Sequence, residues 1–171
     1  VLRKAVLVLR SEGARAVTAP LKVVVTGAAG LLGRYVVKRL LARGDAVIAV
    51  DSLTRYEMMG ASRAQAWPEE CKHDRCLRVC DKFDSSDVFG LSAAERPDAI
   101  VHAAAQTSHP RSIEDPATDF EVNAVGTFRL LELLRTWAPK HGAGLAAPKR
   151  APRLVFISSA KVYGEKVCQA R

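Results

Sequence analysis

The sequence predicts an α/β fold in which a doubly wound parallel sheet carries helices on both faces. Three observations predict it: apolar runs alternate with amphipathic segments, each run is apolar throughout, and a glycine-rich turn joins the first run to the first amphipathic segment. Continuous apolar runs are typical of strands that are buried on both faces. Because strands that alternate with helices usually pair in parallel, one sheet accounts for all of them.

The order of the elements follows from the apolar runs and from the residues that interrupt them. The predicted strands occupy residues 22–26, 46–50, 76–80, 99–104 and 154–157. Helices are predicted over 31–43, 87–95 and 117–137. Gly44 ends the first helix, and Pro116 and Pro139 bracket the third.

The segments between these elements are expected to be irregular, and the last helix is expected to have one buried face. Residues 52–74 are polar and contain Pro68, and residues 139–152 form a loop of Gly, Ala, Pro and Lys. Helical spacing predicts that the buried face of the last helix is formed by Phe120, Ala124, Phe128, Leu131 and Leu134.

The turn from Gly27 to Gly33 indicates a dinucleotide-binding site. Gly27 permits a tight reversal, Gly30 lets the backbone approach a pyrophosphate, and Gly33 lets the helix pack against the strand. Leu31 and Leu32 open the helix, whose N-terminal N–H groups and dipole favour phosphate. The alternative is a glycine turn that binds no ligand.

An acidic residue at the end of the second strand supports the same interpretation. Asp51 stands where a carboxylate accepts hydrogen bonds from the hydroxyls of an adenosine ribose. The same charge would repel a 2′-phosphate. We therefore predict that the site takes NAD.

Small side chains end the fourth predicted strand, in the run His102-Ala103-Ala104-Ala105. Ligands of such sheets bind outside the carboxyl ends of the strands, and Ala103 to Ala105 would let a cofactor lie against the backbone. A simple strand-to-loop turn is the alternative. We expect His102 to be a packing or hydrogen-bonding histidine, and Asn123, an amide within a helix, to hold a strand end in shape.

Two hydroxyl groups follow the fifth predicted strand, on Ser158 and Ser159. At the carboxyl end of a strand they could donate hydrogen bonds to a substrate oxygen. A serine-rich turn without a ligand is the alternative.

Composition narrows the possible partners. The chain has 171 residues, 49% of them hydrophobic, and a net charge of +8. Much of the basic excess lies in residues 1–20 and 140–153, and aromatic residues make up only 6%, so nucleic acid is not an expected partner. No apolar run approaches the ~20 residues of a membrane helix.

Residues 1–20 are expected to be a basic extension, and residues 21–171 one NAD-binding domain. The extension has the composition of an organellar transit peptide, but a tag remnant, a mistranslated upstream region or an appended basic helix would look similar. We expect a cytoplasmic protein, with organellar import left open by this segment.

Four cysteines are present, at 71, 76, 80 and 168. Three of them lie near His73, which makes a zinc site conceivable, but no C-x-x-C pair occurs. We expect reduced thiols and no metal.

In their order and spacing, these segments resemble the extended short-chain dehydrogenase/reductase superfamily over about residues 21–165. The matched features are the turn with Gly27, Gly30 and Gly33, then Asp51, Asp81, the His102–Ala105 strand end, Asn123 with Gly126-Thr127, and Ser158-Ser159 with Val162-Tyr163-Gly164. Within the superfamily the chain is similar to nucleotide-sugar epimerases, particularly the CDP-paratose (CDP-tyvelose) 2-epimerase group. That likeness lies in Gln106-Thr107-Ser108, in residues 112–116, in Asp119-Phe120-Glu121-Val122-Asn123, and in Lys161 before Val162.

The resemblance implies a Rossmann-type fold, NAD as the cofactor and a nucleotide sugar as the substrate of the complete enzyme. It implies that the glycines hold the pyrophosphate together with Leu31 and Leu32, that Asp51 binds the ribose, and that Asp81 contacts the adenine edge. It further implies that Ala103, Ala104 and Ala105 line the cofactor, that Ser159 matches the catalytic Ser/Thr, and that Asn123 matches the structural Asn of the active site. The resemblance is also compatible with a homodimer.

One departure from the superfamily pattern is severe. The acid/base pair of the family is a Tyr with a Lys four residues later, and here Tyr35, Tyr56 and Tyr163 are followed at that spacing by Arg39, Gly60 and Val167. The resemblance therefore implies an incomplete domain, without the carboxyl-terminal strands and the substrate lobe, that is inactive alone. A non-catalytic NAD-binding module and a defective truncated product are the alternatives.

Overall fold

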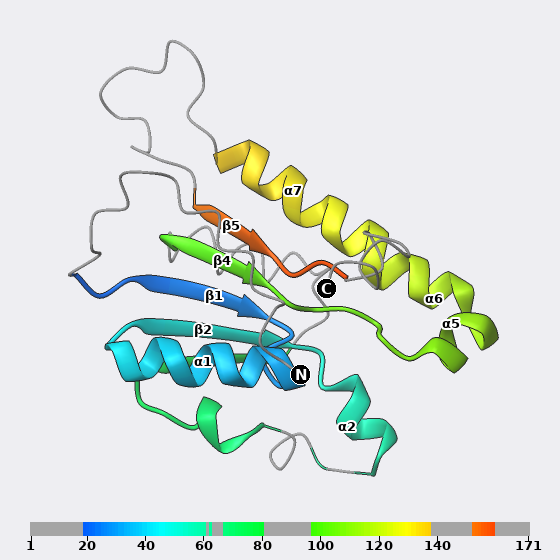
Figure 1. The fold of residues 1–171 in the computed structure, drawn as a ribbon, viewed down its shortest axis with the longest axis horizontal. Coiled ribbons are helices and arrows are strands. Elements are labelled where there is room, and N and C mark those ends of the chain that lie inside the picture. The colour runs from blue at the N-terminus through cyan, green and yellow to red at the C-terminus, as the bar shows by residue number, and fades with distance from the viewer. Residues whose placement is uncertain (1–18, 61, 63–66, 81–96, 138–151, 160–171) are drawn as a thin grey trace, which may run out of the picture.

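The computed structural model of the chain describes residues 19–60, 62, 67–80, 97–137 and 152–159 (Figure 1). Asp81, the predicted helix over 87–95 and nearly all of the basic extension lie outside these residues. The division of the chain into an extension and one domain therefore stays a prediction.

Five strands form one sheet, in the order β3-β2-β1-β4-β5, and every neighbouring pair is parallel. They are β1 (Lys22–Thr26), β2 (Ala46–Asp51), β3 (Cys76–Cys80), β4 (Ala99–His102) and β5 (Arg153–Phe156). The chain winds outward from β1 in one direction and then returns to add β4 and β5 on the other side. The predicted doubly wound parallel α/β fold is therefore confirmed, and the crevice beside β1 is where such sheets bind ligands.

Two long helices cover opposite faces of the sheet (Figure 1). Helix α1 (Leu31–Arg43) packs through Val37 and Leu41 on a core that includes Val23, Val25, Val47 and Ala49. Helix α7 (Gly126–Trp137) packs through Leu130 on Val24, Ile48, Val50 and Ile100. Alternate residues of β1 and β2 thus point to alternate faces, and both faces are buried, as the continuous apolar runs predict.

Strand register brings the carboxyl ends of the strands to one edge. Thr26 at the end of β1 pairs with Val50 of β2 and with His102 of β4, and His102 pairs with Phe156 of β5. The residues that follow these strands therefore line the same edge of the sheet.

The structure corrects the prediction that residues 52–74 are irregular. A helix, α2 (Thr54–Met58), and a 3-10 turn, η1 (Glu69–Cys71), form within them. Both are too short to be stable alone, so they depend on packing, which local sequence does not show. Leu53, which precedes α2, is fully buried and has a left-handed φ of 58°.

The predicted helix over 117–137 is divided into three parts. They are α6 (Pro116–Phe120), a π-helical segment η2 (Glu121–Val125) and α7, and a further helix, α5 (His109–Glu114), precedes them. The predicted buried face is wrong except at Leu134. Phe120, Ala124, Phe128 and Leu131 are exposed, whereas Gly126 and Leu130 are buried and Leu134 and Trp137 pack against the core.

The physical reason is that α7 carries apolar residues on more than one face, so spacing alone did not identify the face that meets the sheet. No helix among the described residues has both the length and the apolar character needed to cross a bilayer.

Candidate cofactor site

The turn between β1 and α1 requires two glycines for packing. Gly27 has a φ of +66°, and a Cβ there would lie 2.6 Å from the carbonyl oxygen of Ala103. A Cβ on Gly33 would lie 2.0 Å from the carbonyl oxygen of Gly27. Gly27 therefore lets the turn approach the end of β4, and Gly33 lets α1 approach the turn.

Gly30 differs in degree, because a Cβ there would have a less severe contact than at Gly27 or Gly33. It adopts an ordinary extended conformation with a φ of −69°, and a Cβ there would meet one atom within 4 Å, the carbonyl oxygen of Gly27 at 3.2 Å. No side chain caps the N-terminus of α1 at this residue, and Leu31 and Leu32 are 64% and 55% exposed. The first N–H groups of a helix have no partner within it, so this end of α1 can donate to a ligand.

The two alanines inside the turn are buried and fixed from several sides. The N–H of Ala28 donates to the carbonyl of Val50 at 3.2 Å. The N–H of Ala29 donates to Oδ2 of Asp51 at 3.0 Å, and its carbonyl accepts from the Tyr56 hydroxyl at 2.9 Å. Residues of β2 and α2 therefore hold the shape of the turn.

Asp51 has a structural role that the sequence analysis missed. Its Oδ1 accepts the N–H of Leu53 at 2.8 Å, and its Oδ2 accepts that of Ala29. Burial raises the pKa of Asp51, and backbone hydrogen bonds from Leu53, Ala29 and Gly30 act against that rise. A carboxylate offers about four acceptor positions, so a ribose hydroxyl can still be accommodated.

A chain of hydrogen bonds connects the end of β4 to α7. The Thr26 hydroxyl accepts the N–H of Ala104 at 3.3 Å and lies 2.7 Å from Nδ1 of His102. Nε2 of His102 lies 3.3 Å from the Thr127 hydroxyl, which donates to the carbonyl of Asn123 at 2.7 Å. The prediction that His102 is a hydrogen-bonding histidine is confirmed.

The direction of these bonds fixes the tautomer of His102. The Thr127 hydroxyl donates its hydrogen to the carbonyl of Asn123, so it can only accept from His102. Nε2 of His102 must therefore carry the hydrogen of that bond. Burial lowers the pKa of His102, which favours the neutral ring. Nδ1 is then an acceptor, and Thr26 donates to it.

Asn123 lies in the π-helical segment and holds the loop after β4. Its Oδ1 accepts the N–H of Gln106 at 2.9 Å, and its Nδ2 donates to the carbonyl of Gln106 at 3.0 Å. The amide therefore satisfies both backbone groups of one residue in the loop after β4, as expected of an amide that holds this segment in shape. A part for Asn123 in cofactor binding stays a prediction. π-Helical turns of this kind are frequent at functional sites.

The remaining predicted site residues lie at the same edge of the sheet. Ala103 and Ala104 are half-buried and Ala105 is exposed, directly after β4. Ser159 is exposed after β5, which pairs with β4, so it lies at the edge that carries the alanines. Binding of a cofactor by the alanines and catalysis by Ser159 stay predictions, and Asp81 lies outside the described residues.

Among the described residues, no three His, Cys, Asp or Glu side chains come together as ligands for a metal ion. Cys71 and Cys76 are both buried in the core under α1. Cys71 donates to the carbonyl of Ala28 at 3.9 Å.

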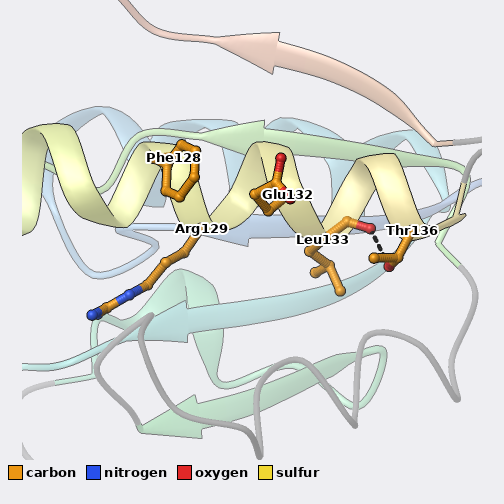
Figure 2. Close-up of a pocket in the computed structure, with 5 residues that line it drawn as sticks. All are labelled: Phe128, Arg129, Glu132, Leu133 and Thr136. Carbon is orange, nitrogen blue, oxygen red and sulfur yellow. Dashed lines mark hydrogen bonds between the residues drawn. The ribbon is translucent and has the colours of Figure 1, made fainter.

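A hollow of about 300 Å³ lies on α7 (Figure 2). It is lined by Phe128, Arg129, Glu132, Leu133 and Thr136. None of the predicted site residues lines it, and it is separate from the glycine turn.

Comparison of the sequence with known proteins identifies the family to which the chain belongs. A family model described as "NAD dependent epimerase/dehydratase family" matches residues 23–169. The chain is 39% identical over 115 residues to the UDP-glucose 4-epimerase of Mycolicibacterium smegmatis, covering 67% of this chain and 35% of that protein. It is 35% identical over 147 residues to the dTDP-glucose 4,6-dehydratase of Shigella flexneri, covering 85% of this chain and 38% of that protein.

Solved structures agree with the sequence relatives. The chain superposes on the UDP-glucose-4-epimerase of Stenotrophomonas maltophila, solved with bound NAD and formylated UDP-arabinopyranose, with a TM-score of 0.60 and 29% identity. The match covers 84% of this chain and 38% of that one. The chain thus spans little more than a third of the relatives it matches. NAD is the cofactor of the matched family, and this chain belongs to the NAD dependent epimerase/dehydratase family.

Proposed function

We propose that this chain binds NAD at the glycine turn and forms the cofactor-binding part of a nucleotide-sugar epimerase. The observation that carries the proposal is Gly30. Packing requires Gly27 and Gly33, whereas a Cβ on Gly30 would meet the carbonyl oxygen of Gly27 at 3.2 Å, and Gly30 stands at the uncapped N-terminus of α1. A glycine at that position suits the close approach of a pyrophosphate.

The described residues offer groups that suit the pyrophosphate and the adenosine ribose of NAD. The pyrophosphate would bind at the N-terminus of α1, where Leu31 and Leu32 begin the helix. The adenosine ribose would bind Asp51 on the β2 side of β1. The nicotinamide half would then lie on the other side of β1, beside the loop that follows β4. NAD, when bound, supplies hydride transfer, and the protein supplies its position and electrostatic surroundings.

For the complete protein we propose a nucleotide-sugar substrate of the CDP-paratose 2-epimerase type. The support is the resemblance in residues 106–108 and 119–123. Ser159 would hydrogen-bond the oxygen of the sugar carbon that is oxidised, since it lies at the edge of the sheet that would face the nicotinamide. No Tyr is followed by a Lys four residues later in the sequence. We therefore expect no sugar turnover by residues 1–171 alone.

Calorimetric titration of the 171-residue chain with NAD and with NADP tests the proposal. NAD should bind, and NADP should bind more weakly because its 2′-phosphate meets the Asp51 carboxylate. Asp51→Ala should weaken NAD binding by about tenfold or more, the usual cost of losing a hydrogen bond to a charged group.

The matched control is Asp74→Ala, which removes an exposed carboxylate from the segment before β3. It changes the net charge equally and should leave NAD affinity unchanged. Absence of NAD binding by the folded parent chain would overturn the proposed function. Equal effects of the two variants would exclude Asp51 from the site.

A further inference from the structure

The side chain of Gln106, in the loop after β4, is held in one orientation by the polar groups around it. Its Nε2 donates to Oδ1 of Asp119 at 3.0 Å and to the carbonyl of Ser108 at 3.0 Å. Its Oε1 accepts the N–H of Ser108 at 2.6 Å. Both amide hydrogens of Gln106 are therefore used within the protein.

Two consecutive helical segments hold this single loop residue. Asp119 lies in α6 and binds the side chain of Gln106, while Asn123 lies in the π-helical segment and binds its backbone. The contact with Ser108 is local to the loop, so it moves with the loop. Asp119 and Asn123 are the contacts that fix the loop relative to the helices.

We infer that Asp119 is a positioning residue for the nicotinamide half of the cofactor and acts through Gln106. This inference rests on the proposed function, because the loop from Ala103 to Ser108 is where that half of NAD would lie. The adenosine ribose would lie across β1, near Asp51, on the side of β1 away from Gln106. Loss of the Asp119 contact should therefore affect one half of the ligand only.

The physical reason is the strength and direction of the contact. A carboxylate that accepts an amide N–H forms a charge-assisted hydrogen bond, which is stronger than a neutral one. Without it, Gln106 keeps its local bonds to Ser108, but its side chain no longer ties the loop to α6. The loop then samples more conformations, and a ligand group that rests on it must restrict them on binding.

The test compares two ligands that share the adenosine and pyrophosphate groups, NAD and ADP. In the 171-residue chain, Asp119→Ala should weaken NAD binding about threefold to tenfold and change ADP binding by less than about twofold. Asp119→Asn keeps an oxygen that accepts from Gln106, so NAD affinity should stay within about threefold of the parent. Calorimetry measures the affinity of the parent and of each variant for the two ligands.

The matched control is Glu121→Ala. Glu121 lies two residues further along and pairs with Arg129 at 2.9 Å, so its removal changes the net charge equally without touching Gln106. It should leave both affinities unchanged. If Asp119→Ala weakens NAD and ADP equally, or weakens neither, Asp119 does not position the nicotinamide half. If the parent chain binds neither ligand, the proposed function itself fails.

A second variant keeps the inference testable if Asp119→Ala does not fold. Gln106→Glu places a second carboxyl group against Asp119, and two such groups that share a site raise the pKa of one of them. NAD affinity should be reduced at neutral pH and should recover as the pH falls and one proton is shared between them. ADP affinity should not show this pH dependence. A flat pH profile for NAD, or a parallel profile for ADP, would overturn the inference.

Discussion

Gly33→Ala should disrupt the packing of α1 on the glycine turn. The added Cβ would lie 2.0 Å from the oxygen and 2.7 Å from the carbon of the Gly27 carbonyl, and 2.8 Å from Cα of Ala28. All three atoms are backbone, so no side chain can rotate away. Relief requires α1 to move by more than 1 Å, which would disturb the buried contacts of Val37 and Leu41.

Overpacking of a core typically costs about 1–3 kcal/mol and occasionally more. Because this clash involves backbone on both sides, we expect a loss of about 3 kcal/mol or more, which lowers the Tm of a domain of this size by roughly 10 °C. Urea and thermal unfolding, followed by circular dichroism, measure both quantities.

Two other glycines provide the controls. Gly60 has a φ of +77° and nothing within 4 Å of a Cβ, so Gly60→Ala should cost only the left-handed backbone conformation, about 1–2 kcal/mol. Gly30→Ala should cost less stability than Gly33→Ala, because its Cβ would lie 3.2 Å from the Gly27 oxygen instead of 2.0 Å. It should weaken NAD binding about tenfold or more, since the methyl group would lie where the pyrophosphate approaches. The packing argument fails if Gly33→Ala is no less stable than Gly60→Ala.

The other two predictions concern the pH dependence of stability and the buried side chain of Leu53. Because burial lowers the pKa of His102 below its ordinary value of 6.5, the unfolded state binds more protons than the folded state near that pH. The free energy of unfolding should therefore fall as the pH is lowered through 6.5. His102→Asn should reduce this pH dependence in urea unfolding, and an unchanged slope would show that His102 is not its source. Leu53→Ala should destabilise the chain by about 2–5 kcal/mol. Leu53→Gly should destabilise the chain no more than Leu53→Ala does, because glycine adopts the φ of 58° without strain. The argument fails if urea unfolding shows Leu53→Gly to be clearly less stable than Leu53→Ala.

The sequence predicts the sheet and its first helix well, because their signals are local. The boundaries of β1, α1 and β3 agree with the structure, and Gly44 ends α1 with a φ of 98°. Continuous apolar strands, a glycine after the helix and a glycine turn before it all indicate the same fold. Where several local signals agree, tertiary contacts have little to correct.

The short helices and the face of α7 could not be predicted in the same way. Helices of five or six residues such as α2 and α5 do not form alone, so local sequence carries little trace of them. The π-helical segment departs from the α-helical repeat over five residues, and a segment this short contains too few residues to show a different periodicity in the sequence.

In the candidate site, too, some features have a local sequence signal and others depend on tertiary contacts. The glycine spacing and Asn123 could be singled out because their residue types are unusual where they stand. The contacts of Asp51 with Ala29 and of Asp119 with Gln106 join residues that are 22 and 13 positions apart. Only the folded chain brings these groups together.

The backbone of Ala29 is held on both sides, since its N–H is bound to β2 and its carbonyl to α2. The peptide groups before and after Ala29 therefore each carry a hydrogen bond that a rotation of that group would break. A nucleotide that arrives at the turn would meet a rigid receptor, and the entropy of ordering this backbone would already have been lost during folding. Association should then proceed without a slow rearrangement of the turn.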